Sequence, residues 1–123
     1  MWKRSHTSIL FVSTGILAGL FVLGFYLTAG PAPVYCQQPF AERDKPIVMF
    51  STRWCPYCKK ARQLFHNNQL DYCEYDINAS GANMQAFDTL GGEGVPLIMV
   101  GHEVFHGYSE TALSEELTRQ GFM

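Results

Sequence analysis

The sequence contains no internal repeat, no low-complexity tract and no broad stripe of basic residues. Without a repeat, solenoid and array architectures are excluded, because they depend on a recurring unit. From Glu42 onward there are seven lysine and arginine residues against eleven aspartate and glutamate residues, so this part of the chain is acidic. An acidic domain without a basic stripe argues against nucleic acid as a partner.

Ligands for a structural zinc ion are also too few. Such a site needs about four cysteine or histidine side chains, usually from two closely spaced pairs. Cys55 and Cys58 form one Cys-x-x-Cys pair, whereas Cys36 and Cys73 stand alone in the sequence. The four histidines do not supply a second pair. We therefore predict no metal site and no tightly bound cofactor.

Charge is absent from residues 8–29, a run of mostly apolar side chains. At ~1.5 Å per residue, a helix of this length covers the ~30 Å of a bilayer core. Lys3 and Arg4 precede the run and the next basic residue is Arg43, which favours a cytoplasmic N-terminus and an exported C-terminal domain. We predict a single-pass membrane anchor over residues 8–29, after a basic N-terminus over residues 1–7.

The alternative for the same run is a secretory signal that is removed after export. The apolar region of a signal is usually ~7–15 residues long, which is shorter than this run, and no clear Ala-x-Ala cleavage site follows it. Either interpretation places the C-terminal part of the chain in an oxidising compartment such as the periplasm.

Residues 30–45 are proline-rich and show little periodicity, which predicts a semi-extended linker. The folded domain is predicted to follow over residues 46–123. Cys36 would then lie in a flexible tether and Cys73 in a buried strand, and a disulfide needs Cα atoms within ~7 Å of each other. We expect Cys73 to stay reduced inside the core and Cys36 to be accessible.

The domain begins with alternating strand and helix patterns. Residues 46–51 form a short apolar run that suits a buried strand, and residues 70–77 form a second strand rich in aromatic residues. Between them, apolar residues recur at helical spacing at positions Cys58, Ala61, Leu64 and Phe65. The basic residues of this helix are expected to face outward, namely Lys59, Lys60 and Arg62. Together these patterns predict a parallel β-α-β unit.

The second half of the domain continues the pattern. Residues 84–90 mark a second helix, and residues 96–100 and 103–108 are two strands joined by a two-residue hairpin turn. Ser109 is well placed to cap a last helix. The predicted order is β-α-β-α-β-β-α, an α/β fold in which helices cover both faces of a four-stranded mixed sheet.

The Cys-Pro-Tyr-Cys segment favours redox chemistry over a structural role. Cys55 is predicted at a helix start, where unpaired N–H groups and the helix dipole favour an anion, and Arg53 and Lys59 add positive charge. Such surroundings lower the pKa of a cysteine thiol, and the thiolate is the species that attacks disulfides. Cys58 lies one turn further along the helix, which suits a resolving thiol. An inert structural disulfide is disfavoured, because its two-residue loop restrains little of the unfolded chain.

The Cys-Pro-Tyr-Cys segment after a buried strand, Gly94-Val95-Pro96 before a hairpin and a glycine turn before the last helix together resemble the glutaredoxin family. The resemblance implies a thioredoxin-like fold, a cis peptide bond at Val95-Pro96, and glutathione as a possible co-substrate. It implies catalytic roles for Cys55 and Cys58, and contacts to substrate or glutathione from Arg53, Tyr57, Val95, Pro96, Gly107, Tyr108 and Ser109.

Three positions depart from the glutathione-binding pattern of that family, and one of them is His106, which stands where the turn before the last helix usually has its first glycine. Thr52 stands where a lysine usually attracts the glycine carboxylate, although Arg53 could substitute for it. Ser109 stands where an aspartate usually pairs with the γ-glutamyl ammonium group, and Glu110 lies one residue too late. A disulfide in another protein is therefore as suitable a substrate as glutathione.

We predict a membrane-tethered thiol-disulfide oxidoreductase of glutaredoxin type that acts through the Cys55–Cys58 dithiol. It is linked to the glutathione or thioredoxin system, and its partners are disulfide-containing proteins or glutathione. One alternative is an iron–sulfur or glutathione-binding carrier, which the proline after Cys55 disfavours. The other is a redox-inactive adaptor at the membrane, which the intact cysteine pair disfavours.

Overall fold

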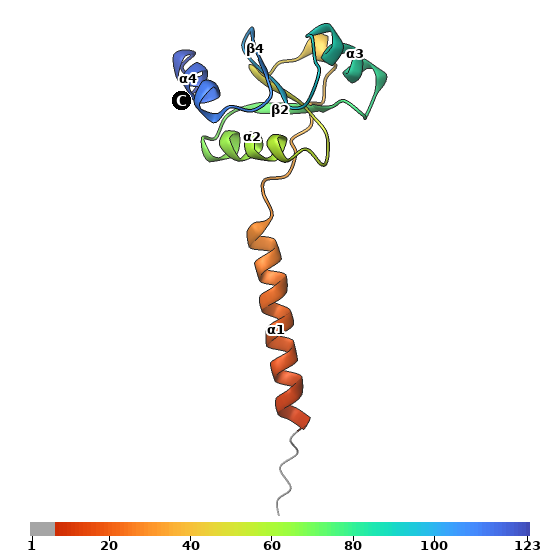
Figure 1. The fold of residues 1–123 in the computed structure, drawn as a ribbon, viewed down its shortest axis with the longest axis vertical. Coiled ribbons are helices and arrows are strands. Elements are labelled where there is room, and N and C mark those ends of the chain that lie inside the picture. Colours follow the sequence, from red (N-terminus) through yellow and green to blue (C-terminus); the bar gives the residue numbers. More distant parts are fainter. Residues whose placement is uncertain (1–6) are drawn as a thin grey trace, which may run out of the picture.

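The computed structural model describes residues 7–123 and contains a four-stranded sheet in the order β2-β1-β3-β4 (Figure 1). In chain order, the elements are α1 (Thr7–Thr28), the short 3-10 helix η1 (Phe40–Glu42), β1 (Ile47–Ser51), α2 (Pro56–Asn67), β2 (Tyr72–Asp76), α3 (Gly81–Thr89), β3 (Leu97–Val100), β4 (Glu103–His106) and α4 (Glu110–Arg119). From β1 onward this order is the predicted β-α-β-α-β-β-α, so the predicted fold is confirmed.

The pairing of the strands also agrees with the prediction. β1 pairs with β2 in parallel, while β3 pairs with β1 and β4 in antiparallel fashion. Gly101 has a φ of +60° in the turn between β3 and β4, which glycine adopts without strain. The carboxyl ends of β1 and β2 lie at the same edge of the sheet, so the segment after β1 is held next to the segment after β2.

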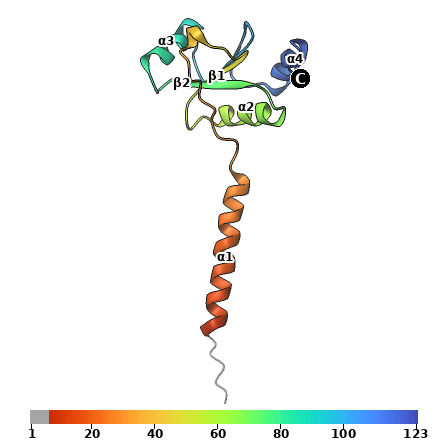
Figure 2. The ribbon, with the colours of Figure 1, turned by 180° about the vertical axis from the view of Figure 1, so that it is seen from behind.

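Each face of the sheet has its own apolar core, because side chains alternate along the strands. Ile47 and Met49 of β1 face α2 and α4, where they pack with Phe65 and Leu117. Val48 and Phe50 point to the opposite face and pack with Phe87 of α3, among others. Two helices thus cover one face of the sheet, and α3 covers the other (Figures 1 and 2).

A buried ion pair joins α2 to the sheet. The Arg62 guanidinium donates two hydrogen bonds to Glu74, from Nε to Oε1 at 2.6 Å and from Nη2 to Oε2 at 2.9 Å. Ser51 Oγ donates a third to Glu74 Oε2 at 2.8 Å. Arg62 is 5% exposed and Glu74 is 0% exposed. The expectation that Arg62 faces outward is therefore wrong, because Glu74 on β2 offers it a partner inside the fold.

The ion pair also affects the ionisation of its surroundings. Burial acts to lower the pKa of Arg62, but the hydrogen bonds and charge of Glu74 outweigh it and the pKa is raised. Burial, together with the nearby Glu74 carboxylate, raises the pKa of Tyr72 to about 12. At neutral pH the guanidinium is therefore charged and the phenol is neutral.

The segment between α1 and β1 packs on the domain. Tyr35 forms a parallel bridge with Glu74, whose backbone N–H donates to Val34 O at 2.7 Å and whose carbonyl accepts from Cys36 N at 2.9 Å. We call residues 34–43 the arm. It adds a short pairing to the outer edge of β2, and this part of the predicted linker is thus bound to the sheet.

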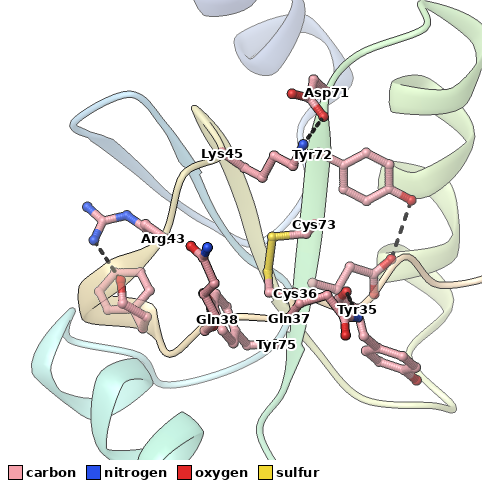
Figure 3. The surroundings of a disulfide bond; sticks show 12 residues. Tyr35, Cys36, Gln37, Gln38, Arg43, Lys45, Asp71, Tyr72, Cys73 and Tyr75 are labelled. Atoms are coloured by element: carbon pink, nitrogen blue, oxygen red, sulfur yellow. Dashed lines mark hydrogen bonds and ion pairs between the residues drawn. A yellow bond between two sulfur atoms is a disulfide. The ribbon is translucent and has the colours of Figure 1, made fainter.

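Cys36 and Cys73 form a disulfide with a Cα–Cα distance of 4.9 Å (Figure 3). The expectation that Cys73 stays reduced and Cys36 lies in a flexible tether is therefore wrong. The prediction assumed that Cys36 is held away from Cys73 in a flexible linker. Instead, the arm pairs with the edge of β2, and this pairing brings the two Cα atoms well within bonding range. In the arm, the Phe40 ring also packs 5.3 Å from Phe50, measured between centroids.

The uncharged N-terminal run forms α1, which extends away from the sheet in both views (Figures 1 and 2). Apolar side chains along it are exposed, including Leu17, Phe21 and Leu27. Among the helices in the described part of the chain, none combines the length and the apolar character needed to cross a membrane.

Substitution Arg62→Ala is expected to lower the free energy of unfolding by roughly 3–5 kcal/mol, because it leaves the Glu74 carboxylate buried without its charged partner. Urea unfolding with both disulfides intact measures the change. The matched control is Arg119→Ala, which removes an exposed pair with Glu116 and should change stability little. Equal losses in the two variants would contradict a special role for the buried pair.

Candidate active site

The cysteine pair lies at the start of α2, directly after the buried strand β1. Cys55 is the N-cap residue, with extended backbone angles (φ −75°, ψ 110°), and Pro56 occupies the first turn of the helix. Proline is tolerated there because its missing N–H would have no partner within the helix. The local sequence thus places Cys55 at the helix terminus and turns Cys58 inward.

The two cysteines are joined in a disulfide with a Cα–Cα distance of 5.2 Å. Cys55 Sγ also accepts a hydrogen bond from the Cys58 backbone N–H at 3.1 Å. The exposed fraction is 7% for Cys55 and 0% for Cys58. Cys55 thus accepts a helix N–H at its sulfur and is slightly less buried than Cys58, which suits an attacking cysteine paired with a resolving one.

The peptide bond between Val95 and Pro96 is cis, as the family resemblance implies. The Pro96 carbonyl accepts a hydrogen bond from Gly107 N at 2.8 Å, and Gly107 has a φ of +85°, where glycine is favoured. Val95, His106 and Gly107 line an open groove of about 400 Å³ together with the loop before Val95. The structure therefore brings Val95, Pro96 and Gly107 together.

Tyr108 and Ser109 lie at the start of α4. Ser109 is its N-cap residue, and its Oγ accepts a hydrogen bond from Ala112 N at 3.3 Å. This confirms the predicted cap. Tyr108 lines a separate hollow with Lys60 and Glu110. The pKa of its phenol is raised, mainly because the group is partly buried and also because the Glu110 carboxylate is nearby.

Arg53 precedes the cysteine pair and Tyr57 lies between its two cysteines, and both residues are exposed. The Lys60 ammonium lies 5.2 Å from the centroid of the Tyr57 ring, within the range of a cation–π contact. Arg53 lines a groove with the arm and the start of α3. Four of the predicted substrate residues thus line three different hollows, namely Arg53, Val95 with Gly107, and Tyr108, while Tyr57, Pro96 and Ser109 line none of the three.

Thr52 adds a feature that residue patterns did not indicate. Its side chain is buried, and Oγ1 has no hydrogen-bond partner among the described residues. Buried hydroxyls usually have a partner, so this group is an exception within the loop that leads to Cys55. The sequence shows only that Thr52 replaces the lysine of the glutathione-binding pattern.

Comparisons with known proteins agree with this geometry. The family model described as glutaredoxin matches residues 47–105, which include both cysteines of the pair and the cis-proline. A glutaredoxin from Pseudomonas aeruginosa is 45% identical over 29 residues, which make up 24% of this chain and 34% of that relative. The aligned segment therefore spans about a third of the curated relative.

Solved structures share the fold at low sequence identity. The glutaredoxin from Archaeoglobus fulgidus aligns with a TM-score of 0.56 at 19% identity, over 65% of this chain and 94% of that one. The glutaredoxin-like NrdH-redoxin from Escherichia coli aligns with a TM-score of 0.52 at 14% identity, over 56% and 91%. Residues 47–105 therefore match the glutaredoxin family model, and the solved structures show that the chain has a thioredoxin-like fold.

Proposed function

We propose that the domain is a thiol-disulfide oxidoreductase of glutaredoxin type. The observation that carries the proposal is the Cys55–Cys58 disulfide at the N-terminus of α2, in which Cys55 is the N-cap residue and Cys58 lies fully buried one turn further along. Such a pair can be opened and closed by thiol-disulfide exchange, with Cys55 as the sulfur at the helix terminus that an incoming thiolate attacks. The family match over residues 47–105 supports the same activity.

The reaction transfers two electrons from the reduced pair to a substrate disulfide. The Cys55 thiolate attacks one substrate sulfur, the substrate S–S bond breaks, and the other substrate sulfur leaves as a thiolate that takes up a proton. Cys58, deprotonated by solvent, then attacks Cys55 Sγ and closes the Cys55–Cys58 disulfide. The second substrate thiol is released at this step. Two external thiols, from glutathione or a dithiol protein, restore the reduced pair.

Substrate binding is proposed to use the surface between the cis-proline and α4. The Val95 backbone beside the cis bond can pair with an extended substrate, as an added strand does. Gly107, Tyr108 and Ser109 supply backbone groups and a hydroxyl on the neighbouring side, while Arg53 and Tyr57 contact substrate near Cys55. Glutathione fits as a co-substrate. The iron–sulfur or glutathione carrier is not favoured by the family and sequence matches.

We further propose that the N-terminal helix attaches the domain to a membrane and that the domain faces an oxidising compartment such as the periplasm. The support is the uncharged sequence over residues 8–29 and the exposed apolar side chains along α1. The Cys36–Cys73 disulfide agrees with this location, because disulfides outside catalytic sites persist mainly in oxidising compartments.

Substitution Cys55→Ser is expected to abolish reduction of insulin and of hydroxyethyl disulfide, because it removes the attacking sulfur. Cys58→Ser should retain activity on glutathione mixed disulfides, which a single thiol can resolve with a second glutathione, and should lose dithiol reduction of insulin. Steady-state assays with a glutathione-coupled reductant measure both. Substantial activity in Cys55→Ser would refute the mechanism.

In the fully reduced protein at about pH 6, Cys55 is expected to react with iodoacetamide on the order of ten times faster than Cys58, because it is more exposed and lies at the helix N-terminus. Mass spectrometry of timed samples gives both rates. The single variants Cys55→Ser and Cys58→Ser identify each labelled peptide. Similar rates at the two positions would contradict the assignment of an attacking and a resolving thiol.

The membrane proposal predicts that the full chain stays with the membrane fraction after alkaline carbonate extraction, whereas a chain that begins at residue 30 is released. A C-terminal tag should be degraded by protease in intact spheroplasts. If the tag is protected until the membrane is permeabilised, the domain faces the cytoplasm. A shortened mature chain in the soluble fraction would instead identify residues 8–29 as a removed signal.

A further inference from the structure

A second groove lies between the arm and the start of α3, and Arg53 from the loop before the cysteine pair contributes to its lining. Its volume is about 430 Å³. Four segments line it, namely residues 35–39 of the arm, Arg53 before the cysteine pair, residues 74–76 at the end of β2, and residues 79–83 leading into α3. Arg53 is separated from Cys55 by a single residue, so the groove is connected to the cysteine pair through the loop that leads into α2.

The arm wall of this groove is held in place by three kinds of bond. The Cys36–Cys73 disulfide ties it covalently to β2 (Figure 3). The backbone N–H and carbonyl of Glu74 also pair with the arm on both sides of Tyr35. The Tyr75 hydroxyl donates to Gln38 O at 2.9 Å. The wall is therefore a fixed surface, and a ligand does not have to order it on binding.

The opposite wall of the groove, formed by the loop between β2 and α3, is held by hydrogen bonds. The Asn83 side-chain amide donates to Asp76 O at 2.9 Å, and Ser80 caps α3 by accepting from Asn83 N at 3.1 Å. Asp76 in turn accepts a hydrogen bond from Asn78 N at 2.9 Å. These bonds hold the loop between β2 and α3 in one conformation against the groove.

The lining of the groove is mainly apolar, with polar groups placed along it, a combination that suits a polypeptide chain. Gln37 and Gln38 supply side-chain amides, and the arm and loop contribute backbone groups, so both donors and acceptors are available for peptide groups. None of the ion pairs found among the described residues involves Arg53. Its guanidinium is exposed and is thus available for a carboxylate of the ligand.

We propose that this groove binds the polypeptide segment that flanks the target cysteine of a protein disulfide, in an extended conformation. The inference rests on the proposed oxidoreductase function and specifies its substrate class. The arm lies outside residues 47–105, the part that matches the glutaredoxin family, so one wall of the groove is formed by a segment outside that match, while the other wall and Arg53 lie inside it. A small disulfide substrate has no flanking polypeptide chain, so the groove does not contribute to its binding.

The test compares insulin, a polypeptide disulfide, with hydroxyethyl disulfide, a small one. Ala82→Phe places a bulky side chain at an exposed position in the groove and keeps the arm disulfide. The double variant Cys36→Ser/Cys73→Ser removes the disulfide that ties the arm to β2. Thr118→Phe is the control, since it adds the same side chain to an exposed position on α4 outside the groove.

Both groove variants are expected to raise the KM for insulin by about five- to tenfold, which matches the loss of one or two ordinary polar contacts. Their kinetics with hydroxyethyl disulfide and those of Thr118→Phe with both substrates should stay at the wild-type values. An insulin KM unchanged from wild type, or an equal loss on both substrates, overturns the groove as a polypeptide site. A wild-type protein inactive on both substrates refutes the oxidoreductase function itself.

Discussion

The buried carboxylate of Glu74 is the constraint on which the arrangement of the domain depends. Its side chain binds Arg62 of α2 and Ser51 at the end of β1, and its backbone N–H and carbonyl pair with the arm. One residue thus joins the helix that carries the cysteine pair, the strand that leads to it and the arm. A buried charge is tolerated only when its partners are in place, so correct packing of these elements is a condition for burying Glu74 at all.

The arm changes the character of the sheet edge. An uncovered outer edge of β2 would present unpaired N–H and C=O groups, which can pair with other chains. The bridge at Tyr35 satisfies the Glu74 groups, and the disulfide keeps the arm there. Cys36 and Cys73 are 37 residues apart, and closing a loop of that size removes enough entropy from the unfolded chain to stabilise the fold by about 3–4 kcal/mol. The arm is therefore part of the folded domain.

The order of the elements could be predicted from the sequence because each depends on local signals. The apolar runs, the cap residue Ser109 and the hairpin turn at Gly101 are determined by neighbouring residues, and the structure agrees with all three. The position of Arg62 could not be predicted in this way. Its burial depends on Glu74, which lies on another element, and a helical pattern alone assigns a charged residue to the solvent side.

In the candidate site, too, the features that depend on local sequence could be predicted, and those that depend on long-range contacts could not. The placement of Cys55 and Cys58 follows from the local start of α2, whereas the cis-proline was implied only by the family resemblance. The arm could not be predicted, because proline-rich segments without periodicity are typical of linkers. Its packing depends on long-range contacts, namely one disulfide and the aromatic cluster around Phe40. Under the proposed function the cysteine pair supplies the chemistry, and the arm, which lies outside the family match, forms one wall of a groove whose other wall and Arg53 lie inside it, so the choice of substrate would depend on both parts of the chain.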